Sequence, residues 1–156
     1  MTKKKVFVSG CFDMLHSGHI RFLEKAAKYG DVCLALGSDR TLIGLKGRPP
    51  VTTEQERKYM LEAVRHVKRC LISRGTGILD FTDELKRVKP DIFIVNEDGN
   101  TPLKAELCRR LGIKYVVLQR DPHEGLPARS TTSLRHECQI PYRLDLAGGW
   151  LDQPFV

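Results

Sequence analysis

The sequence lacks the long apolar run of a membrane-spanning protein. No uninterrupted stretch reaches the roughly 18 apolar residues that a spanning helix needs. A basic N-terminus, Met1–Lys5, is followed by only a short apolar run, Val6–Val8, which is too brief for the core of a secretory signal peptide. We therefore expect a cytoplasmic protein that does not engage a membrane.

Paired cysteines are also missing. The five cysteines are odd in number, scattered, and nowhere spaced as C-x-x-C, so the sequence supports neither a zinc site nor a redox pair. Cys33, Cys70 and Cys108 lie within apolar periodic segments, which favours buried free thiols in a reducing compartment. We predict no metal site built from the side chains of the chain itself.

Aromatic residues are scarce, at 7% of the chain, which limits how the formal net charge of +7 can be interpreted. Proteins that bind single-stranded nucleic acid combine basic residues with aromatic side chains on which bases stack. Here the basic residues are spread along the chain and are not interleaved with aromatics. A basic surface also attracts nucleoside triphosphates and sugar phosphates, so we expect small phosphorylated ligands and no nucleic acid.

What the sequence does contain is a regular alternation of strand and helix patterns. A length of 156 residues suits one compact domain. The alternation predicts right-handed crossovers and an α/β, Rossmann-like, doubly wound parallel sheet of about five strands with helices on both faces. The predicted strands are 6–8, 32–36, 70–72, 91–95 and 115–118, and three predicted helices are 18–29, 78–88 and 102–111. A fourth helix is predicted to begin at a capping box, Thr53–Glu56, and to bury Met60, Leu61, Val64 and Val67.

The most informative segment is Ser9–His19, which lies between the first predicted strand and the first predicted helix. His16 and His19 are three residues apart at the start of that helix, so they share one helical face and can point at one spot. The first turn of a helix also offers unpaired N–H groups, and the small residues nearby would let an anion approach the backbone. The segment therefore predicts a phosphate-handling site.

The pattern G-x-F-D-x-x-H-x-G-H in Gly10–His19 resembles the signature of the cytidylyltransferase-like nucleotidyltransferases, a superfamily that includes glycerol-3-phosphate cytidylyltransferase and heptose-1-phosphate adenylyltransferase. The tetrapeptide H-x-G-H alone would be weak, because class I aminoacyl-tRNA synthetases use a similar one. The resemblance implies that His16 and His19 are catalytic. It also implies nucleotide contacts from Gly10, Cys11, Phe12 and Gly18.

Two later segments match the superfamily in the expected order. The first is a loop, Leu45–Pro50, that carries Lys46 ahead of the capped helix. A solvated loop cation is the alternative, but the resemblance implies that Lys46 binds phosphate and is catalytic. Arg57, in the same match, would contact either the acceptor phosphate or a partner in a structural ion pair.

The second matching segment is Pro127–Arg135. Its hydroxyl residues would cap a short helix, and on sequence alone a cap is the alternative to a binding role. In the superfamily a similar serine–threonine–threonine segment contacts the triphosphate. The resemblance covers roughly residues 5–135 and therefore implies a catalytic Arg129 and nucleotide contacts from Ser130, Thr131 and Thr132.

The loop after the fourth predicted strand, Val95–Asn100, departs from the superfamily pattern. Relatives tend to be rich in glycine and aspartate there, often followed by an aromatic residue, whereas this chain has asparagine in the aromatic position. Asp98 is predicted to contact the acceptor or a metal, with an ordinary Asp-Gly turn as the alternative. We also expect Asp13 to contact the acceptor, as predicted for Arg57.

The C-terminal segment differs in character from the rest. Ile140–Asp152 resembles the first strand of a sugar kinase of the galactokinase type, and a chance apolar strand is the alternative. We therefore expect residues 1–138 to form a nucleotidyltransferase domain. Residues 139–156 would begin a second, truncated sugar-kinase-like domain, so that the chain is the front of a longer two-domain protein.

The resemblance implies an enzyme that transfers a nucleotidyl group from CTP or ATP to a phosphorylated small molecule and releases pyrophosphate. Mg²⁺ is the expected cofactor, because it neutralises bridging phosphate oxygens without a dedicated protein cage. The kinase-like tail favours a sugar 1-phosphate acceptor, with glycerol 3-phosphate second. The alternative from another class is a non-catalytic nucleotide-binding module that regulates a fused kinase. The resemblance also leaves room for a homodimer.

Overall fold

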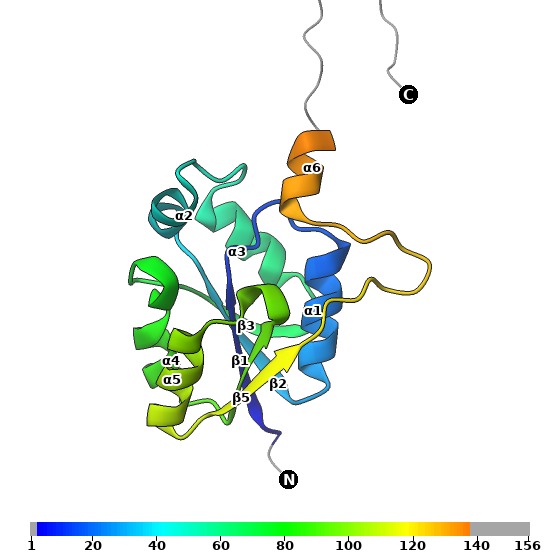
Figure 1. The fold of residues 1–156 in the computed structure, drawn as a ribbon. Coiled ribbons are helices and arrows are strands. Elements are labelled where there is room, and N and C mark those ends of the chain that lie inside the picture. Colours follow the sequence, from blue (N-terminus) through cyan, green and yellow to red (C-terminus); the bar gives the residue numbers. More distant parts are fainter. Residues whose placement is uncertain (1–2, 138–156) are drawn as a thin grey trace, which may run out of the picture.

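The computed structural model describes residues 3–137, which form one parallel sheet flanked by helices (Figure 1). The predicted kinase-like segment, residues 139–156, lies outside the described residues, and its assignment stays a prediction. The strands are β1 (Lys5–Gly10), β2 (Asp31–Leu36), β3 (Val67–Ile72), β4 (Ile92–Asn96) and β5 (Lys114–Leu118). The α-helices are α1 (Ser17–Ala27), α2 (Asp39–Lys46), α3 (Glu54–Glu62), α4 (Thr82–Val88), α5 (Pro102–Leu111) and α6 (Thr131–Glu137).

The first strand, β1, lies at the centre of the sheet, whose strand order is β3-β2-β1-β4-β5. All neighbouring strands are parallel, and Val8 of β1 pairs with Leu34 on one side and with Ile94 on the other. The chain winds outward from β1 to β3 and then crosses back to β4, so the strand order reverses between β1 and β4. This arrangement confirms the predicted doubly wound α/β fold.

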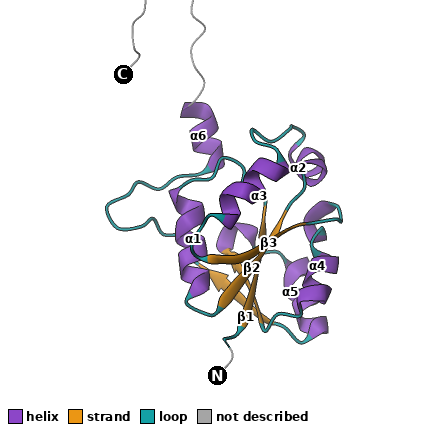
Figure 2. Cartoon of the chain, turned by 180° about the vertical axis from the view of Figure 1, so that it is seen from behind, coloured by secondary structure: helices purple, strands orange, loops and turns teal. Residues whose placement is uncertain are grey.

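Alternate residues of β1 face two separate layers of helices, because successive side chains of a strand point to opposite faces. Val8 is buried in a core cluster with residues of α1 and α3, whereas Phe7 packs in a second cluster with residues of α4 and α5. The rings of Phe7 and Phe93 meet edge to face, with 5.4 Å between their centroids. Figure 2 shows α1 on one side of the sheet and α4 with α5 on the other, so the predicted helices on both faces are confirmed.

A helix occupies the segment around Lys46 that was expected to be a loop. Ser38 caps this helix, α2, by accepting the backbone N–H of Thr41 at 3.2 Å, and Gly47 ends it with a left-handed φ of 65°. Only Thr41 and Leu42 of its residues are buried. The apolar period of α2 is therefore too short to be recognised in the sequence, and Lys46 lies on its last turn.

The helix that follows the predicted capping box is shorter than expected. The box itself is present: the Thr53 hydroxyl accepts the N–H of Glu56, and the Glu56 carboxylate accepts the N–H of Thr53. The helix ends before Val67, because that residue pairs with β2 as the start of β3. The next predicted helix, 78–88, is divided in two. A short 3-10 turn, Gly77–Leu79, comes before α4, and the Thr82 hydroxyl donates to the Leu79 carbonyl at 2.7 Å where the two meet.

The side chain of Arg57, from α3, joins the carboxyl ends of β1 and β2. It is fully buried, at 0% exposure. Its guanidinium donates to the Cys11 carbonyl, just after β1, and at 3.0 Å to the Gly37 carbonyl, just after β2. It also donates to the Thr52 carbonyl at 3.1 Å and forms an ion pair with Asp39 at 2.6 Å. Every nitrogen of the guanidinium therefore has a protein partner.

This network separates the two roles predicted for Arg57. The side chain forms the structural ion pair and is fully buried. Its predicted contact with the acceptor stays a prediction.

We predict that Arg57→Met lowers the free energy of unfolding by about 3–5 kcal/mol, because the change leaves buried carbonyls and one carboxylate without their partner. Urea unfolding followed by circular dichroism measures the loss. Gln55→Ala, an exposed change in the same helix, is the matched control and should stay within about 0.5 kcal/mol of the wild type. A loss under about 1 kcal/mol for Arg57→Met would contradict the structural role.

Candidate active site

A cleft of about 430 Å³ opens at the carboxyl ends of the central strands, where the strand order reverses. Doubly wound proteins bind their ligands at this point, so the cleft lies where the sequence predicted the site. It gathers residues from the β1–α1 turn, the end of α2 and the connections that follow β4 and β5. The lining residues are Ser9, Gly10, Cys11, Phe12, Asp13, His16, Gly18, His19, Phe22, Lys46, Asn96, Asp98, Gly99, Lys104, Arg120, Ser130, Thr131 and Thr132.

The turn between β1 and α1 depends on glycine and on unusual backbone angles. Phe12 and Met14 adopt φ angles of 49° and 52°, in the left-handed region that residues with a side chain rarely occupy. A Cβ on Gly10 would lie 2.9 Å from the Phe12 ring, and a Cβ on Gly18 would lie 3.0 Å from the His16 ring. A side chain at either position would therefore force the neighbouring ring to shift, so both positions favour glycine.

The rings of His16 and His19 stack at the start of α1, with centroids 3.8 Å apart and planes inclined by 23°. His16 caps the helix: its Nδ1 accepts the N–H of Gly18 at 3.1 Å, so a neutral ring carries its proton on Nε2. The Nδ1 atom of His19 is buried and has no hydrogen-bond partner among the described residues. The structure thus brings the two histidines together, as their spacing predicted.

Both histidines are neutral near pH 7. Burial, with the neighbouring groups His16 and Arg120, lowers the pKa of His19 to about 3. Burial also lowers the pKa of His16, and the Arg120 guanidinium adds to that shift. A neutral imidazole can donate one hydrogen bond without carrying charge. The pair can therefore hydrogen-bond phosphate oxygens, while the positive charge of the cleft comes from lysine and arginine.

The predicted triphosphate contacts come together from distant parts of the chain. Lys46 lies at the end of α2, and Ser130, Thr131 and Thr132 lie at the start of α6, yet all four line the same cleft. The Thr131 hydroxyl donates to the backbone carbonyl of Asp13 at 2.9 Å, which ties α6 to the β1–α1 turn. A cation and several hydroxyls therefore surround the histidine pair.

Two cations that the sequence analysis did not identify also line the cleft. Lys104, in the first turn of α5, donates to the Gly99 carbonyl at 2.8 Å, and burial lowers the pKa of its ammonium group. Arg120, after β5, forms an ion pair with Asp98 at 3.1 Å and donates to the Arg129 carbonyl at 2.9 Å. Both cations follow strands whose carboxyl ends meet at the cleft, and this position is the signal that identifies them.

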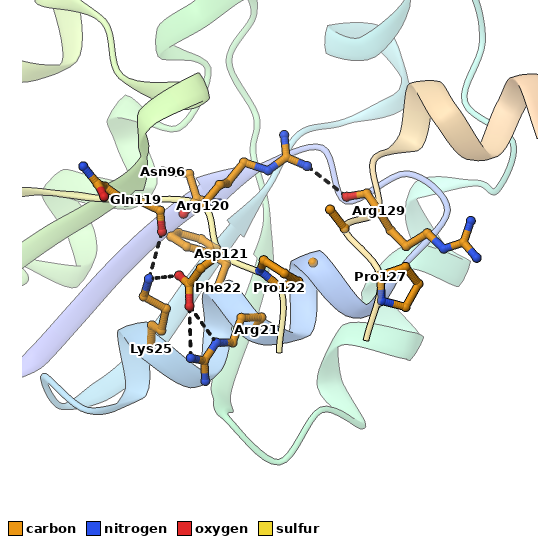
Figure 3. A pocket seen from close by; sticks show the side chains of 12 residues that line it. Arg21, Phe22, Lys25, Asn96, Gln119, Arg120, Asp121, Pro122, Pro127 and Arg129 are labelled. Atoms are coloured by element: carbon orange, nitrogen blue, oxygen red, sulfur yellow. Dashed lines mark hydrogen bonds and ion pairs between the residues drawn. The ribbon is translucent and has the colours of Figure 1, made fainter. Parts of the chain in front are cut away.

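Arg129 lies beside the cleft. Figure 3 shows its side chain pointing away from Arg120, where it lines a hollow of about 60 Å³ that adjoins α1. Its backbone carbonyl, which accepts the hydrogen bond from Arg120, is the part that supports the site. The structure therefore does not bring the guanidinium predicted to be catalytic to the histidine pair, and Arg120 is the arginine that lines the cleft.

Asp13, predicted to contact the acceptor, connects two walls of the cleft. It is only 5% exposed. One carboxylate oxygen accepts the N–H of Val51 at 2.9 Å, and the other pairs with Arg135 of α6 at 2.7 Å. Burial raises the pKa of Asp13, but these partners outweigh burial and hold the pKa below its usual range. Because the protein engages both oxygens, Asp13 positions two walls of the cleft, and its predicted contact with the acceptor stays a prediction.

Asp98 lies in a short turn after β4, Glu97–Gly99, and also lines the cleft. The turn named as the alternative is therefore present, and the residue also faces the cleft. Its contact with an acceptor or a metal stays a prediction.

The long connection between β5 and α6 is fastened to α1. Asp121 forms ion pairs with Lys25 and, at 3.0 Å, with Arg21, and Lys25 also donates to the Gln119 carbonyl at 2.8 Å (Figure 3). Arg120 lies between Gln119 and Asp121 in the sequence. These contacts therefore hold the Arg120 guanidinium at the cleft.

A doubly wound sheet with paired histidines, cations and hydroxyls at its switch point suits the binding of a nucleotide's phosphates. Residues 7–143 match the family model described as Cytidylyltransferase-like. The chain belongs to this family, and it is a nucleotidyltransferase enzyme, as the sequence motifs predicted.

Curated relatives of similar length bear the name FAD synthase. One from Methanopyrus kandleri is 32% identical over 137 residues, covering 84% of this chain and 89% of the relative. One from Pyrococcus horikoshii is 36% identical over 135 residues, covering 84% and 88%. The match therefore extends over nearly the whole of each relative.

Solved structures agree with this assignment of the fold. A lipopolysaccharide core biosynthesis protein from Thermoplasma volcanium is 25% identical and has a TM-score of 0.64, covering 78% of this chain and 99% of that one. A pantothenate synthetase from Thermus thermophilus shares the fold alone. It is 15% identical and has a TM-score of 0.52, covering 76% of this chain and 56% of that one. Within residues 3–137, no helix has the length and apolar character needed to cross a membrane.

We predict that His19 makes the fold less stable in acid. The unfolded chain binds a proton at this residue near pH 6.5, whereas the folded chain resists protonation until about pH 3. The free energy of unfolding should therefore fall as the pH drops from 6.5 towards 3, by at most about 1.4 kcal/mol per pH unit for this group.

Urea unfolding of the wild type and of His19→Gln, at about pH 7.5 and about pH 4.5, isolates this contribution from those of other titrating groups. The wild type should lose more stability than the variant on acidification. Equal losses in the two proteins would mean that His19 is not held neutral by the fold.

Proposed function

We propose that this enzyme transfers a nucleotidyl group from ATP or CTP to the phosphate of a small acceptor and releases pyrophosphate. The observation that carries the proposal is the neutral pair His16 and His19, stacked at a helix start inside a cleft that Lys46, Lys104 and Arg120 make positive. Such a site suits the neutralisation of a triphosphate and the stabilisation of charge that develops on it.

The reaction needs no covalent enzyme intermediate. An oxygen of the acceptor phosphate attacks the α-phosphorus, the bond from that phosphorus to the bridging oxygen breaks, and the electron pair leaves on pyrophosphate. Nε2–H of His16 would donate to the phosphate oxygens as their charge grows, because its Nδ1 is already engaged by the helix. Lys46 and Arg120 would hold the phosphates, and the hydroxyls of residues 130–132 would orient them.

The donor atoms of the cleft fit Mg²⁺ that arrives with the substrate. Mg²⁺ typically binds one or two carboxylates together with phosphate oxygens. No group of three or more potential metal ligands occurs within residues 3–137, but Asp98 presents a carboxylate that is 57% exposed. Asp98 and the triphosphate would therefore hold the ion, which supplies neutralisation of the bridging phosphate oxygens.

The relatives favour ATP as the donor. FAD contains an adenylyl group joined to a flavin phosphate. The product that the name FAD synthase describes therefore has the same kind of bond between two phosphates that the proposed transfer would form. As the first candidate acceptor we propose a sugar or polyol phosphate, with a sugar 1-phosphate ahead of glycerol 3-phosphate, on the strength of the kinase-like sequence beyond residue 138. The flavin phosphate itself is the second candidate acceptor, supported by the 32–36% identity to these relatives. The homodimer and the fused kinase stay predictions.

We predict that His16→Ala and His19→Ala each lower kcat by roughly 100-fold or more, the usual loss when a transition-state hydrogen-bond donor is removed. Pyrophosphate release, with the donor and acceptor that the wild type turns over best, measures the effect. His123→Ala, in the exposed connection between β5 and α6, is the matched control and should leave kcat unchanged. Variants within a few-fold of the wild type would exclude the histidine pair from the chemistry.

A panel of pyrophosphate-release assays tests the substrates directly. ATP and CTP are each combined with a sugar 1-phosphate, glycerol 3-phosphate and the flavin phosphate. Release with ATP and a sugar or polyol phosphate is the expected result. Release with the flavin phosphate alone would establish the second candidate, and no release with any pair would overturn the proposed transfer.

A further inference from the structure

A second cavity, of about 230 Å³, adjoins the cleft beside the ends of β1 and β2. It shares Ser9, Gly10, Cys11, Asp98, Gly99 and Lys104 with the cleft, so the two spaces adjoin. Its remaining lining includes Thr41 of α2 and Asp80, which precedes α4. We call this cavity the side pocket.

Asp80 brings a buried carboxylate with an unused oxygen to the side pocket. The residue is 7% exposed, and its Oδ2 atom has no hydrogen-bond partner among residues 3–137. A Cβ placed on Gly37 would lie 3.5 Å from Oδ2 and 3.6 Å from Sγ of Cys11, which shows that this oxygen and the thiol flank one small space over the glycine. A buried acceptor without a partner costs free energy, and a ligand that donates a hydrogen bond removes that cost.

Lys104 brings a cation to the side pocket, which the carboxylates of Asp80 and Asp98 also line. Its ammonium group is held by the Gly99 carbonyl at 2.8 Å, at the junction with the cleft. Burial and the nearby carboxylate of Glu84 raise the pKa of Asp80, and the charge of Lys104 partly opposes that shift. A hydroxyl group on the ligand can donate a hydrogen bond to Asp80 without adding charge to the pocket.

The size of the side pocket also limits the ligand. A volume of 230 Å³ lies below the roughly 300–1,000 Å³ of cavities that take drug-sized molecules. The space suits a small hydroxylated fragment and disfavours a large fused ring. A phosphate attached to such a fragment would point past Lys104 into the cleft, because the two cavities join there.

We propose that the side pocket binds the hydroxyl-bearing part of the acceptor, with Asp80 as the residue that selects sugar and polyol phosphates. This inference rests on the proposed function, since it names the acceptor class of the same reaction. Asp80 accepts a hydrogen bond from an acceptor hydroxyl and takes no part in bond making or breaking.

The test compares Asp80→Asn with the wild type. The amide keeps the shape of the side chain and replaces a charged hydrogen-bond acceptor with a weaker neutral one. We expect kcat/KM for a sugar or polyol phosphate to fall roughly 10- to 100-fold, while the Kd for ATP, measured by calorimetry, stays unchanged. Asp83→Asn, an exposed change in α4, is the matched control and should alter neither value.

A second variant and a set of substrate analogues keep the inference testable if Asp80→Asn fails to fold. Gly37→Ala adds a methyl group in ordinary contact with Oδ2 of Asp80, at a backbone φ that alanine can adopt, and should lower kcat/KM for the same acceptors by filling the space. Deoxy analogues of the acceptor should be poor substrates of the wild type, and this penalty should disappear in Asp80→Asn.

The outcomes separate this inference from the proposed function. If the wild type releases pyrophosphate but Asp80→Asn retains full kcat/KM, or if deoxy analogues react as well as hydroxylated acceptors, the role of Asp80 is overturned and nucleotidyl transfer stands. If the wild type binds ATP but releases no pyrophosphate with any acceptor, the proposed function fails and this inference fails with it.

Discussion

The geometry of the cleft depends on the buried guanidinium of Arg57. A buried charge is strongly unfavourable unless it is fully paired, and here the carbonyls after β1 and β2, the carbonyl of Thr52 and the carboxylate of Asp39 complete the pairing. The end of β1 leads directly to the histidine turn, and Asp39 starts the helix that ends in Lys46. One side chain therefore helps to set how far the cation at Lys46 lies from the histidines.

The cleft combines cationic side chains with uncharged hydrogen-bond donors. Lys46, Lys104 and Arg120 suit the charge of a triphosphate, and a further pair of imidazolium ions would add repulsion among the cations in the empty site. Burial keeps His16 and His19 neutral, so they offer directed hydrogen bonds in place of additional charge. This division of roles agrees with a reaction that relies on positioning and on stabilisation of developing charge.

The sequence predicted the sheet, its layers and the histidine pair, because each of these has a local signature. Apolar runs mark the buried strands, and the i, i+3 spacing of His16 and His19 decides that they share a face. Lys104 and Arg120 were missed because isolated cations in a basic chain resemble surface residues, and only the strand order brings them to the cleft. The burial of Arg57 was equally hidden, since it depends on carbonyls contributed by three separate segments.

The last helix, α6, is attached to the domain mainly through polar contacts. No residue in 131–136 is fully buried, and the helix is joined to the β1–α1 turn through Thr131 and Arg135, both of which bond to Asp13. Segments with few buried apolar contacts open locally at a small fraction of the global free energy of unfolding. A ligand that binds the hydroxyls of this helix also stabilises its docked form, in proportion to the logarithm of the ligand concentration relative to its Kd. The proposed nucleotide binding and the docking equilibrium of the chain's last described helix are therefore thermodynamically coupled. A substitution far from the phosphates could weaken nucleotide binding simply by favouring the undocked helix.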